Sequence, residues 1–139
     1  MGPLGLSNLE TVNNNWDYSG GPDATEMLGF MIANLPSVGI WNADGELVAH
    51  EVTSPGGLHV NLFVDEKYRG RGFAKIVTLE LARQMTEIGI VPATLITIDN
   101  TISQKLHERC GYTTKKNQVL SWLHSTPNEL PPSGCLCCM

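Results

Sequence analysis

Hydrophobic residues recur along the chain with two periods, one close to 3.6 residues and the other close to 2, which predicts alternating helices and strands. Gly21 and Pro22 open a segment with helical spacing that ends near residues 34–36. Its apolar residues are Ala24, Met27, Leu28, Met31, Ile32 and Leu35. A second helix is predicted from about Gly72 to Ile88, and Gly89 suits a left-handed C-cap. Its apolar stripe is Phe73, Val77, Leu81, Met85 and Ile88.

Runs with alternating or β-branched residues predict the strands. These runs are Val38 to Trp41, Glu46 to Val52, Leu58 to Val64, Ala93 to Ile98 and Val119 to Leu123. The stretch from Asn42 to Gly45 is rich in residues that tolerate left-handed backbone angles and predicts a hairpin, and Ser54 to Gly57 predicts a second turn. A short helix capped by Asn100 or Thr101 is expected through Arg109. The order α, β, β, β, α, β, α, β predicts an α/β layer fold.

Length and composition narrow the classes of function. A chain of 139 residues is one domain's worth, so we expect a single site. Its 42% hydrophobic and 17% charged residues are typical of a soluble globular domain, and no apolar run approaches the ~20 residues that span a bilayer. The net charge of -5 argues against binding along a nucleic-acid backbone, which needs clustered Lys and Arg. We therefore expect neither a membrane nor a nucleic acid as partner.

The first residues of the chain show no recognisable targeting signal, and the last residues are expected to form a tail. Residues 1–8 have no signal-peptide or transit-peptide pattern. We expect a folded domain over residues 1–126 and a flexible tail over residues 127–139 that contains Cys135, Cys137 and Cys138. A metal-binding site or a lipidation site in the tail remains an alternative to a flexible tail without function. A prenylation motif would need Cys at the position of Leu136. Cys110 is isolated and is interpreted as a small buried hydrophobe rather than an acyl carrier.

The segment from Tyr68 to Lys75 lies between a predicted strand and the first turn of a predicted helix. Glycines there allow backbone N–H groups to converge on an anion, the helix N-terminus adds partial positive charge, and Arg69 and Arg71 supply charged donors. The segment therefore predicts a diphosphate site. The alternative is a Gly-rich basic turn that only connects strand to helix.

This loop resembles part of a known family. Arg69-x-x-Gly72-x-Ala74 is similar to the coenzyme A diphosphate loop of Gcn5-related N-acetyltransferases, and Asn100-x-x-Ser103-x-x-Leu106-His107-x-x-x-Gly111-Tyr112 resembles the second motif of that superfamily, beside the pantetheine arm. The resemblance implies a mixed, mostly antiparallel sheet with splayed central strands, acyl-coenzyme A as co-substrate, and no metal. The residues that it implies at the cofactor are Leu62, Phe63, Val64, Arg69, Gly70, Arg71, Gly72, Phe73, Ala74, Asn100 and Ser103.

A closer resemblance, from Leu6 through Trp122, is to the carboxyl-terminal half of the glycine N-acyltransferase family. The segments that carry it are Trp16-x-Tyr18-x-Gly20, Asn34-Leu35-Pro36-Ser37, Asp44-Gly45-Glu46 and Tyr68-Arg69. It implies acyl transfer to the amino group of glycine or a similar small amino acid. Full-length members carry an additional amino-terminal half, so the chain is either a fragment or a short form.

The resemblance also indicates that the general base of the family is absent from its usual position in this chain. It implies that backbone amides near Phe63 and Val64 polarise the thioester carbonyl, whereas the position of the family's glutamate base is Leu58. Three candidates stay open for the acid and base. His59 is adjacent to Leu58, but strand alternation directs it to the opposite face unless a bulge re-aims it; Glu51 could act through water; and His107 occupies the position of a tyrosine acid in many members.

Two other functions remain compatible with the sequence. Because Leu58 cannot accept a proton, one is a non-catalytic acyl-coenzyme A binding module. The other is an acetyltransferase for a different small amine. We expect an intracellular protein, and the sequence does not distinguish the cytoplasm from the mitochondrion or indicate the acyl length, the acceptor or the oligomeric state.

Overall fold

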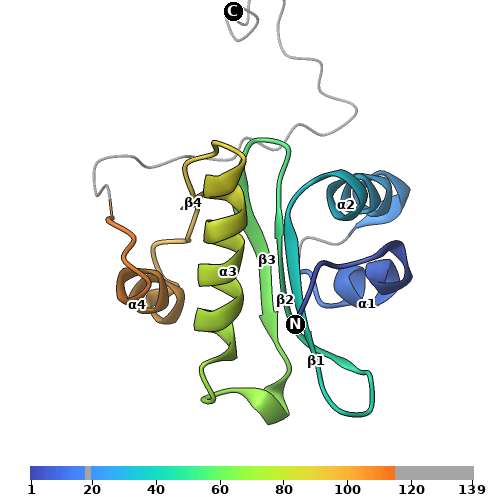
Figure 1. Ribbon diagram of the computed structural model, residues 1–139, viewed down its shortest axis with the longest axis horizontal. Helices are drawn as coiled ribbons and strands as arrows, with labels where there is room; N and C mark the ends of the chain where they lie inside the picture. The colour runs from blue at the N-terminus through green and yellow to red at the C-terminus, as the bar shows by residue number, and fades with distance from the viewer. Residues whose placement is uncertain (18–19, 115–139) are drawn as a thin grey trace, which may run out of the picture.

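Four strands form one mixed sheet in the order β1-β2-β3-β4 in the computed structural model, which describes residues 1–17 and 20–114 (Figure 1). The strands are β1 (Ser37–Trp41), β2 (Leu47–Thr53), β3 (Leu58–Val64) and β4 (Ala93–Thr94). The first three pair antiparallel, and β4 pairs parallel with β3. This arrangement confirms the mixed, mostly antiparallel sheet expected from the sequence.

Helices cover both faces of the sheet (Figure 1). On one face lie a short 3-10 turn, η1 (Leu6–Asn8), and the helices α1 (Leu9–Asn14) and α2 (Gly21–Asn34). The other face carries α3 (Phe73–Glu87), and α4 (Thr101–Arg109) packs beside α3. A second 3-10 turn, η2 (Glu66–Tyr68), connects β3 to the loop before α3.

Two hydrophobic clusters, one on each face, hold these layers together. The cluster under α1 and α2 is built on Leu4, Val12, Leu28, Met31, Ile32 and Val52. The cluster under α3 is built on Val38, Ala49, Val77, Leu81 and Met85. Burying each such aliphatic side chain is worth about 1.5–3 kcal/mol, so the two clusters account for the attachment of the helices to the sheet. The predicted stripes of both long helices are confirmed at these positions.

Four local predictions differ from the structure or fall outside it. The strand predicted from Ala93 to Ile98 was wrong beyond Thr94, because only two of its residues pair with β3 and the chain then diverges. Ile88, the last residue of the predicted apolar stripe, lies at the C-cap after α3 and is 59% exposed, unlike the buried residues of that stripe. Helix α1 was missed. Residues 119–123 and the cysteine tail lie outside the described residues.

Helix α1 shows how tertiary packing overrides propensity. Its sequence is rich in asparagine, which is a poor helix former. Val12 is nevertheless completely buried in the cluster under α2, and this contact holds the short segment in helical form. No helix among residues 1–17 and 20–114 combines the length and the apolar character needed to cross a bilayer.

Candidate functional site

A β-bulge interrupts the centre of β3. His50 of β2 pairs with Phe63, and Val52 pairs with Val60, so two residues of β3, Asn61 and Leu62, lie opposite one residue of β2. Among the described residues, Asn61 is the only one other than glycine with a positive φ, at 54°. Such an extra residue shifts the alternation of side chains by one position.

The packing of β3 shows this shift directly. Val60 packs against the cluster under α1 and α2, whereas Leu62, two residues later, packs against the cluster under α3. In a regular strand both side chains would lie on one face. The bulge is fixed by the Asn61 side chain, whose Nδ2 donates to the Val12 carbonyl at 3.2 Å.

Buried His50 supports the bulge from the α1 face. Its Nδ1 lies 3.2 Å from the Asn61 carbonyl and its Nε2 lies 3.3 Å from Asn15 Nδ2, and its ring stacks on Phe63. Both contacts are satisfied by a neutral ring with the proton on Nδ1. Burial lowers the pKa of His50 to about 4, and the bond to the Asn61 carbonyl opposes this only in part. His50 is therefore a neutral structural support.

Beyond the bulge, β3 and β4 part. Their pairing ends at His59 and Thr94, where Thr94 Oγ1 donates to the His59 carbonyl at 3.2 Å. β3 continues to Val64 without β4 beside it, and Figure 1 shows how short β4 is. The Asp65 N–H donates to Val48 of β2, so alternation directs the Val64 N–H away from β2, toward the open edge. The splayed strands expected from the sequence are present.

The loop before α3, residues 69–72, has the geometry of an anion site and is hereafter the anion loop. Gly70 and Gly72 both have positive φ, 73° and 84°, which other residues adopt only at a cost. Gly72 is the N-cap of α3, and no side chain caps that end. Within the described part of the chain, the N–H groups of residues 70–75 have no hydrogen-bond partner. The expected donors are therefore not satisfied by residues 1–17 or 20–114.

The basic and aromatic side chains of this loop are held in place. Arg69 Nε donates to the Val64 carbonyl at 3.1 Å and ties the loop to the end of β3. The Arg71 guanidinium lies 5.2 Å from the centre of the Tyr68 ring, and Tyr68 stacks against Phe73. The Nη groups of Arg69 have no partner among the described residues, so they are available to a ligand.

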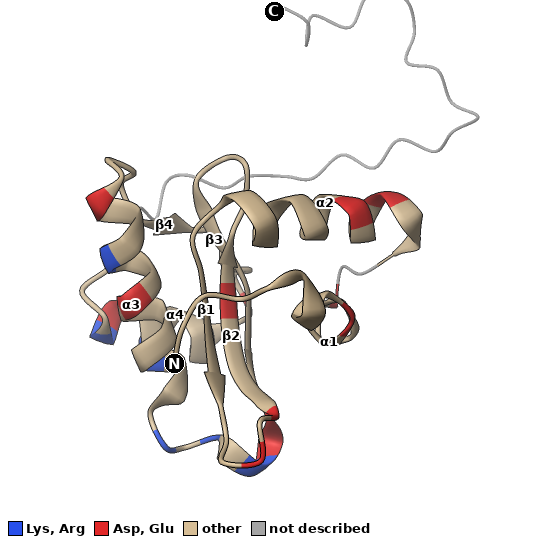
Figure 2. Cartoon of the chain, turned by 45° about the vertical axis from the view of Figure 1, so that its right-hand side comes forward, with Lys and Arg blue, Asp and Glu red and all other residues tan. Residues whose placement is uncertain are grey.

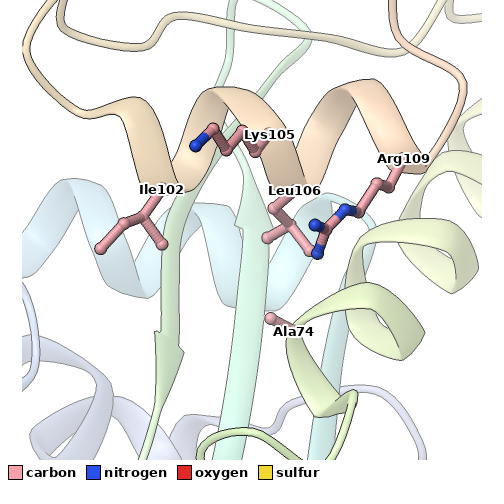
Figure 3. Close-up of a pocket in the computed structure, with 5 residues that line it drawn as sticks. All are labelled: Ala74, Ile102, Lys105, Leu106 and Arg109. Atoms are coloured by element: carbon pink, nitrogen blue, oxygen red, sulfur yellow. The ribbon is translucent and has the colours of Figure 1, made fainter.

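A pocket of about 290 Å³ lies between the first turn of α3 and α4. Its lining residues are Ala74, Ile102, Lys105, Leu106 and Arg109. Figure 3 shows Leu106 and Arg109 directed from α4 toward Ala74, which belongs to the helix that begins at the anion loop. The pocket thus combines an apolar wall with two cations and adjoins that loop.

Charge is divided between the two parts of the chain. All nine Lys and Arg residues of the sequence come after position 66, beginning with Lys67. Figure 2 shows the basic residues on the anion loop, α3 and α4, whereas α1 and α2 carry only acidic charges. Among the described residues, the positive side chains are therefore confined to η2, the loop before α3, α3 and α4.

The two residues predicted near the pantetheine arm begin α4. Asn100 is the N-cap, and its Oδ1 accepts from the Ser103 N–H at 3.1 Å. The Ser103 hydroxyl lies 3.4 Å from His107 Nδ1. Asn100 thus has a structural role as a cap, and its expected contact with a cofactor stays a prediction.

The three candidate acid and base residues lie near one another. Glu51 and His59 are each 1% exposed, and Glu51 Oε2 lies 3.3 Å from His59 Nδ1. The two atoms are close but not aligned as a hydrogen bond, and neither has another partner among the described residues. On its other side, His59 Nε2 lies 2.9 Å from the hydroxyl of Tyr112. The cluster of Glu51, His59 and Tyr112 is hereafter the buried triad.

His107 borders the buried triad. Its ring meets the Tyr112 ring edge to face at 5.3 Å, and its Nδ1 lies 2.8 Å from the Ser103 carbonyl. This bond assigns the proton of a neutral ring to Nδ1. His107 Nε2 is buried and has no partner in the described part of the chain.

The orientation of His59 follows from strand alternation. Its contacts with Glu51 and Tyr112 place it on the side of α3 and α4, and the bulge lies two residues further on, at Asn61. Leu58 precedes His59 and carries no group that can accept a proton. Sequence reasoning missed Tyr112 as part of this cluster, although the Gly111-Tyr112 pair of the second motif contained it.

Burial also affects the groups beside His59. The pKa of Tyr112 is raised by burial first, and further by the charges of Glu51 and Cys110. The pKa of the Cys110 thiol is raised by burial, partly opposed by Lys75. Tyr112 is therefore a protonated hydroxyl at neutral pH. Within residues 1–17 and 20–114, no group of three or more His, Cys, Asp or Glu side chains is arranged to hold a metal ion.

Comparisons with known proteins agree with this fold. The model of the family described as FR47-like protein matches residues 37–122. A Drosophila protein of known structure superposes with a TM-score of 0.72 at 24% identity over 79% of this chain, which spans only 37% of that protein. A Gcn5-related N-acetyltransferase from Ralstonia eutropha gives 0.65 at 19% identity, covering 87% of this chain and 96% of its own.

A third structure contains a coenzyme A group. It is described as AAC(6')-Iy in complex with the bisubstrate analogue CoA-S-monomethyl-acetylneamine. It superposes with a TM-score of 0.70 at 20% identity and covers 88% of this chain and 95% of its own. At these identities the likeness establishes the fold, and it confirms the fold class expected from the sequence.

Proposed function

Because the chain belongs to the FR47-like family and has the fold of Gcn5-related N-acetyltransferases, we propose that it transfers an acyl group from acyl-coenzyme A to the amino group of glycine or a similar small amino acid. The observation that carries the proposal is the set of N–H groups at residues 70–75, which have no partner in the described part of the chain and lie beyond the end of β3, where the strands part. The amino acid acceptor is supported by the resemblance to the glycine N-acyltransferase family.

Coenzyme A binding uses the loop and the pocket together. The diphosphate accepts hydrogen bonds from the N–H groups at the start of α3, where the helix dipole favours negative charge. Arg69 adds charged donors, and Lys105 and Arg109 add positive charge at the adjoining pocket. The apolar wall of that pocket, including Leu106, suits the uncharged part of the cofactor.

The acyl group then lies in the opening between β3 and β4. The Val64 N–H, directed to the open edge, is a donor for the thioester oxygen as it gains negative charge in the tetrahedral intermediate. Coenzyme A occupies the side of α3 and α4, and the amine enters the same opening to reach the thioester carbon. Neither step depends on the identity of the side chain at position 64.

Thiol release is the direct test. Purified protein is incubated with acetyl-, benzoyl- or medium-chain acyl-coenzyme A and with glycine or glutamine, and free thiol is followed over time. We expect release with at least one pair and a matching N-acyl amino acid by mass spectrometry. Coenzyme A binding measured by calorimetry without release from any pair would instead indicate a binding module.

A second acceptor class is favoured by the charge distribution. Residues 1–66 contain no Lys or Arg, so among these residues no side-chain cation faces an acceptor carboxylate from α1 or α2. An amine without a carboxylate would not need such a cation. Release with simple amines or amino sugars, but not with amino acids, would identify the chain as an N-acyltransferase for another small amine.

A further inference from the structure

We propose that the buried triad of Glu51, His59 and Tyr112 is a proton relay that takes the proton from the attacking amine and returns it to the departing sulfur of coenzyme A. This inference rests on the proposed acyl transfer and identifies its acid and base. It also accounts for turnover with a leucine at position 58, where the related family has a glutamate.

The polar atoms of the triad follow one another from Tyr112 through His59 to Glu51, with a hydrogen bond at the first step and a close contact at the second. The Tyr112 hydroxyl lies 2.9 Å from His59 Nε2, and His59 Nδ1 lies 3.3 Å from Glu51 Oε2. A phenol that donates to Nε2 leaves the imidazole proton on Nδ1, facing the carboxylate. A base oriented by a carboxylate and bonded to a hydroxyl is the arrangement that moves protons in many acyl-transfer enzymes.

The triad lies at the point where β3 and β4 begin to part. His59 is the last residue of β3 that pairs with β4, so its side chain stands where the two strands begin to part. Glu51 and His59 are shielded from solvent, whereas Tyr112 is only partly buried. Tyr112 is the one member of the triad with part of its surface exposed, so we place the substrate beside its hydroxyl.

The proton that leaves the amine is the proton that the thiolate receives, so the reaction needs no further acid or base. When the amine adds to the thioester carbon, one N–H proton passes to Tyr112 Oη while the Tyr112 proton passes to His59 Nε2, and Glu51 stabilises the imidazolium. When the carbon–sulfur bond breaks, its electron pair stays on sulfur, and the proton returns through Tyr112 to give the thiol. One hydroxyl can serve both atoms because nitrogen and sulfur are bonded to the same carbon.

The surroundings keep the hydroxyl in its protonated form between these steps. Burial, and then the charges of Glu51 and Cys110, raise the pKa of Tyr112, so a free tyrosinate does not accumulate. His107 also faces Tyr112, edge to face, and Lys75 acts on Cys110. These groups are the titratable neighbours that a pH profile of the reaction has to take into account.

Tyr112→Phe removes the hydroxyl and keeps the ring. In the full chain we expect kcat to fall by about 100-fold or more, the scale of general acid–base catalysis, with coenzyme A affinity within about twofold of wild type. His59→Gln should cause a loss of similar size and serves as the second variant if Tyr112→Phe folds poorly. Thr114→Val removes an exposed hydroxyl two residues further along and should leave kcat unchanged.

A measurement independent of turnover tests the hydrogen bond. In ¹⁵N spectra of the histidine rings, His59 should have its proton on Nδ1, and Tyr112→Phe should shift the Nε2 signal. Full turnover in Tyr112→Phe, or an unchanged Nε2 signal, would overturn the relay while the acyl-transfer assignment stands. Wild-type protein that binds coenzyme A but releases no thiol with any acceptor would overturn both.

Discussion

Protonation of His50 should make the fold sensitive to mild acid. His50 is fully buried and bonded to the Asn61 carbonyl and to Asn15, and burial lowers its pKa from 6.5 to about 4. A group whose folded pKa lies below its unfolded pKa binds more protons in the unfolded state between the two values. The free energy of unfolding must therefore decrease as pH falls from about 6.5 to about 4.

The size of the effect follows from the same shift. Each pKa unit corresponds to about 1.4 kcal/mol, so the change from 6.5 to about 4 removes roughly 3 kcal/mol of stability. That amount is a large share of the 5–15 kcal/mol typical of a domain. The loss should be nearly complete at pH 4, because the folded protein itself binds the proton below that value.

Urea unfolding at a series of pH values measures this loss. Wild type and His50→Gln are compared from pH 7.5 to pH 4, because glutamine offers an N–H donor and an oxygen acceptor without titrating in this range. The variant should be less stable at pH 7.5, having lost the stacking on Phe63, but the gap should close by roughly 3 kcal/mol as pH falls. A gap that stays constant with pH would refute the neutral state assigned to His50.

Three further substitutions test the loop and the core. Arg69→Ala should weaken coenzyme A binding by about 1.5–3 kcal/mol in calorimetry, the range for hydrogen bonds to charged groups, whereas Arg83→Ala on the exposed face of α3 should not. Gly72→Ala forces a side chain into φ 84° and should cost about 1–2 kcal/mol in urea unfolding while also weakening the cofactor; equal affinity would contradict the anion site. Leu81→Ala empties a fully buried position and should cost about 2–5 kcal/mol, so a cost below 1 kcal/mol would contradict the packing of α3.

The elements that depend on their own residues were predictable from the sequence. Helices α2 and α3 have periodic apolar stripes, the hairpin has a glycine at φ 82°, and Asn100 caps α4 through its own side chain. The backbone of the loop before α3 was predictable for the same reason, because its glycines and its position before a helix are local features. The residues that determine the structure of each of these segments lie within the segment or a few residues from it.

Features that depend on contacts between residues distant in the sequence were not predictable from it. The length of β4 is set by where β3 leaves it, and α1 forms because Val12 enters a core supplied by other segments. Tyr112 joins His59 across 53 positions of the chain, so no local pattern indicates the contact. The bulge at Asn61 likewise appears only when β3 is registered against β2.

The bulge in β3 places His59 and two residues beyond it, Leu62 and Val64, on the same side of the sheet. If the same residues paired with β2 without the bulge, Leu62 and Val64 would turn toward α1 and α2, while His59 kept its direction. The acid–base end of the strand would then be out of phase with the end that leads to the anion loop. Substitutions of Asn61, whose side chain fixes the bulge through the Val12 carbonyl, should therefore be tolerated less well than other substitutions on β3.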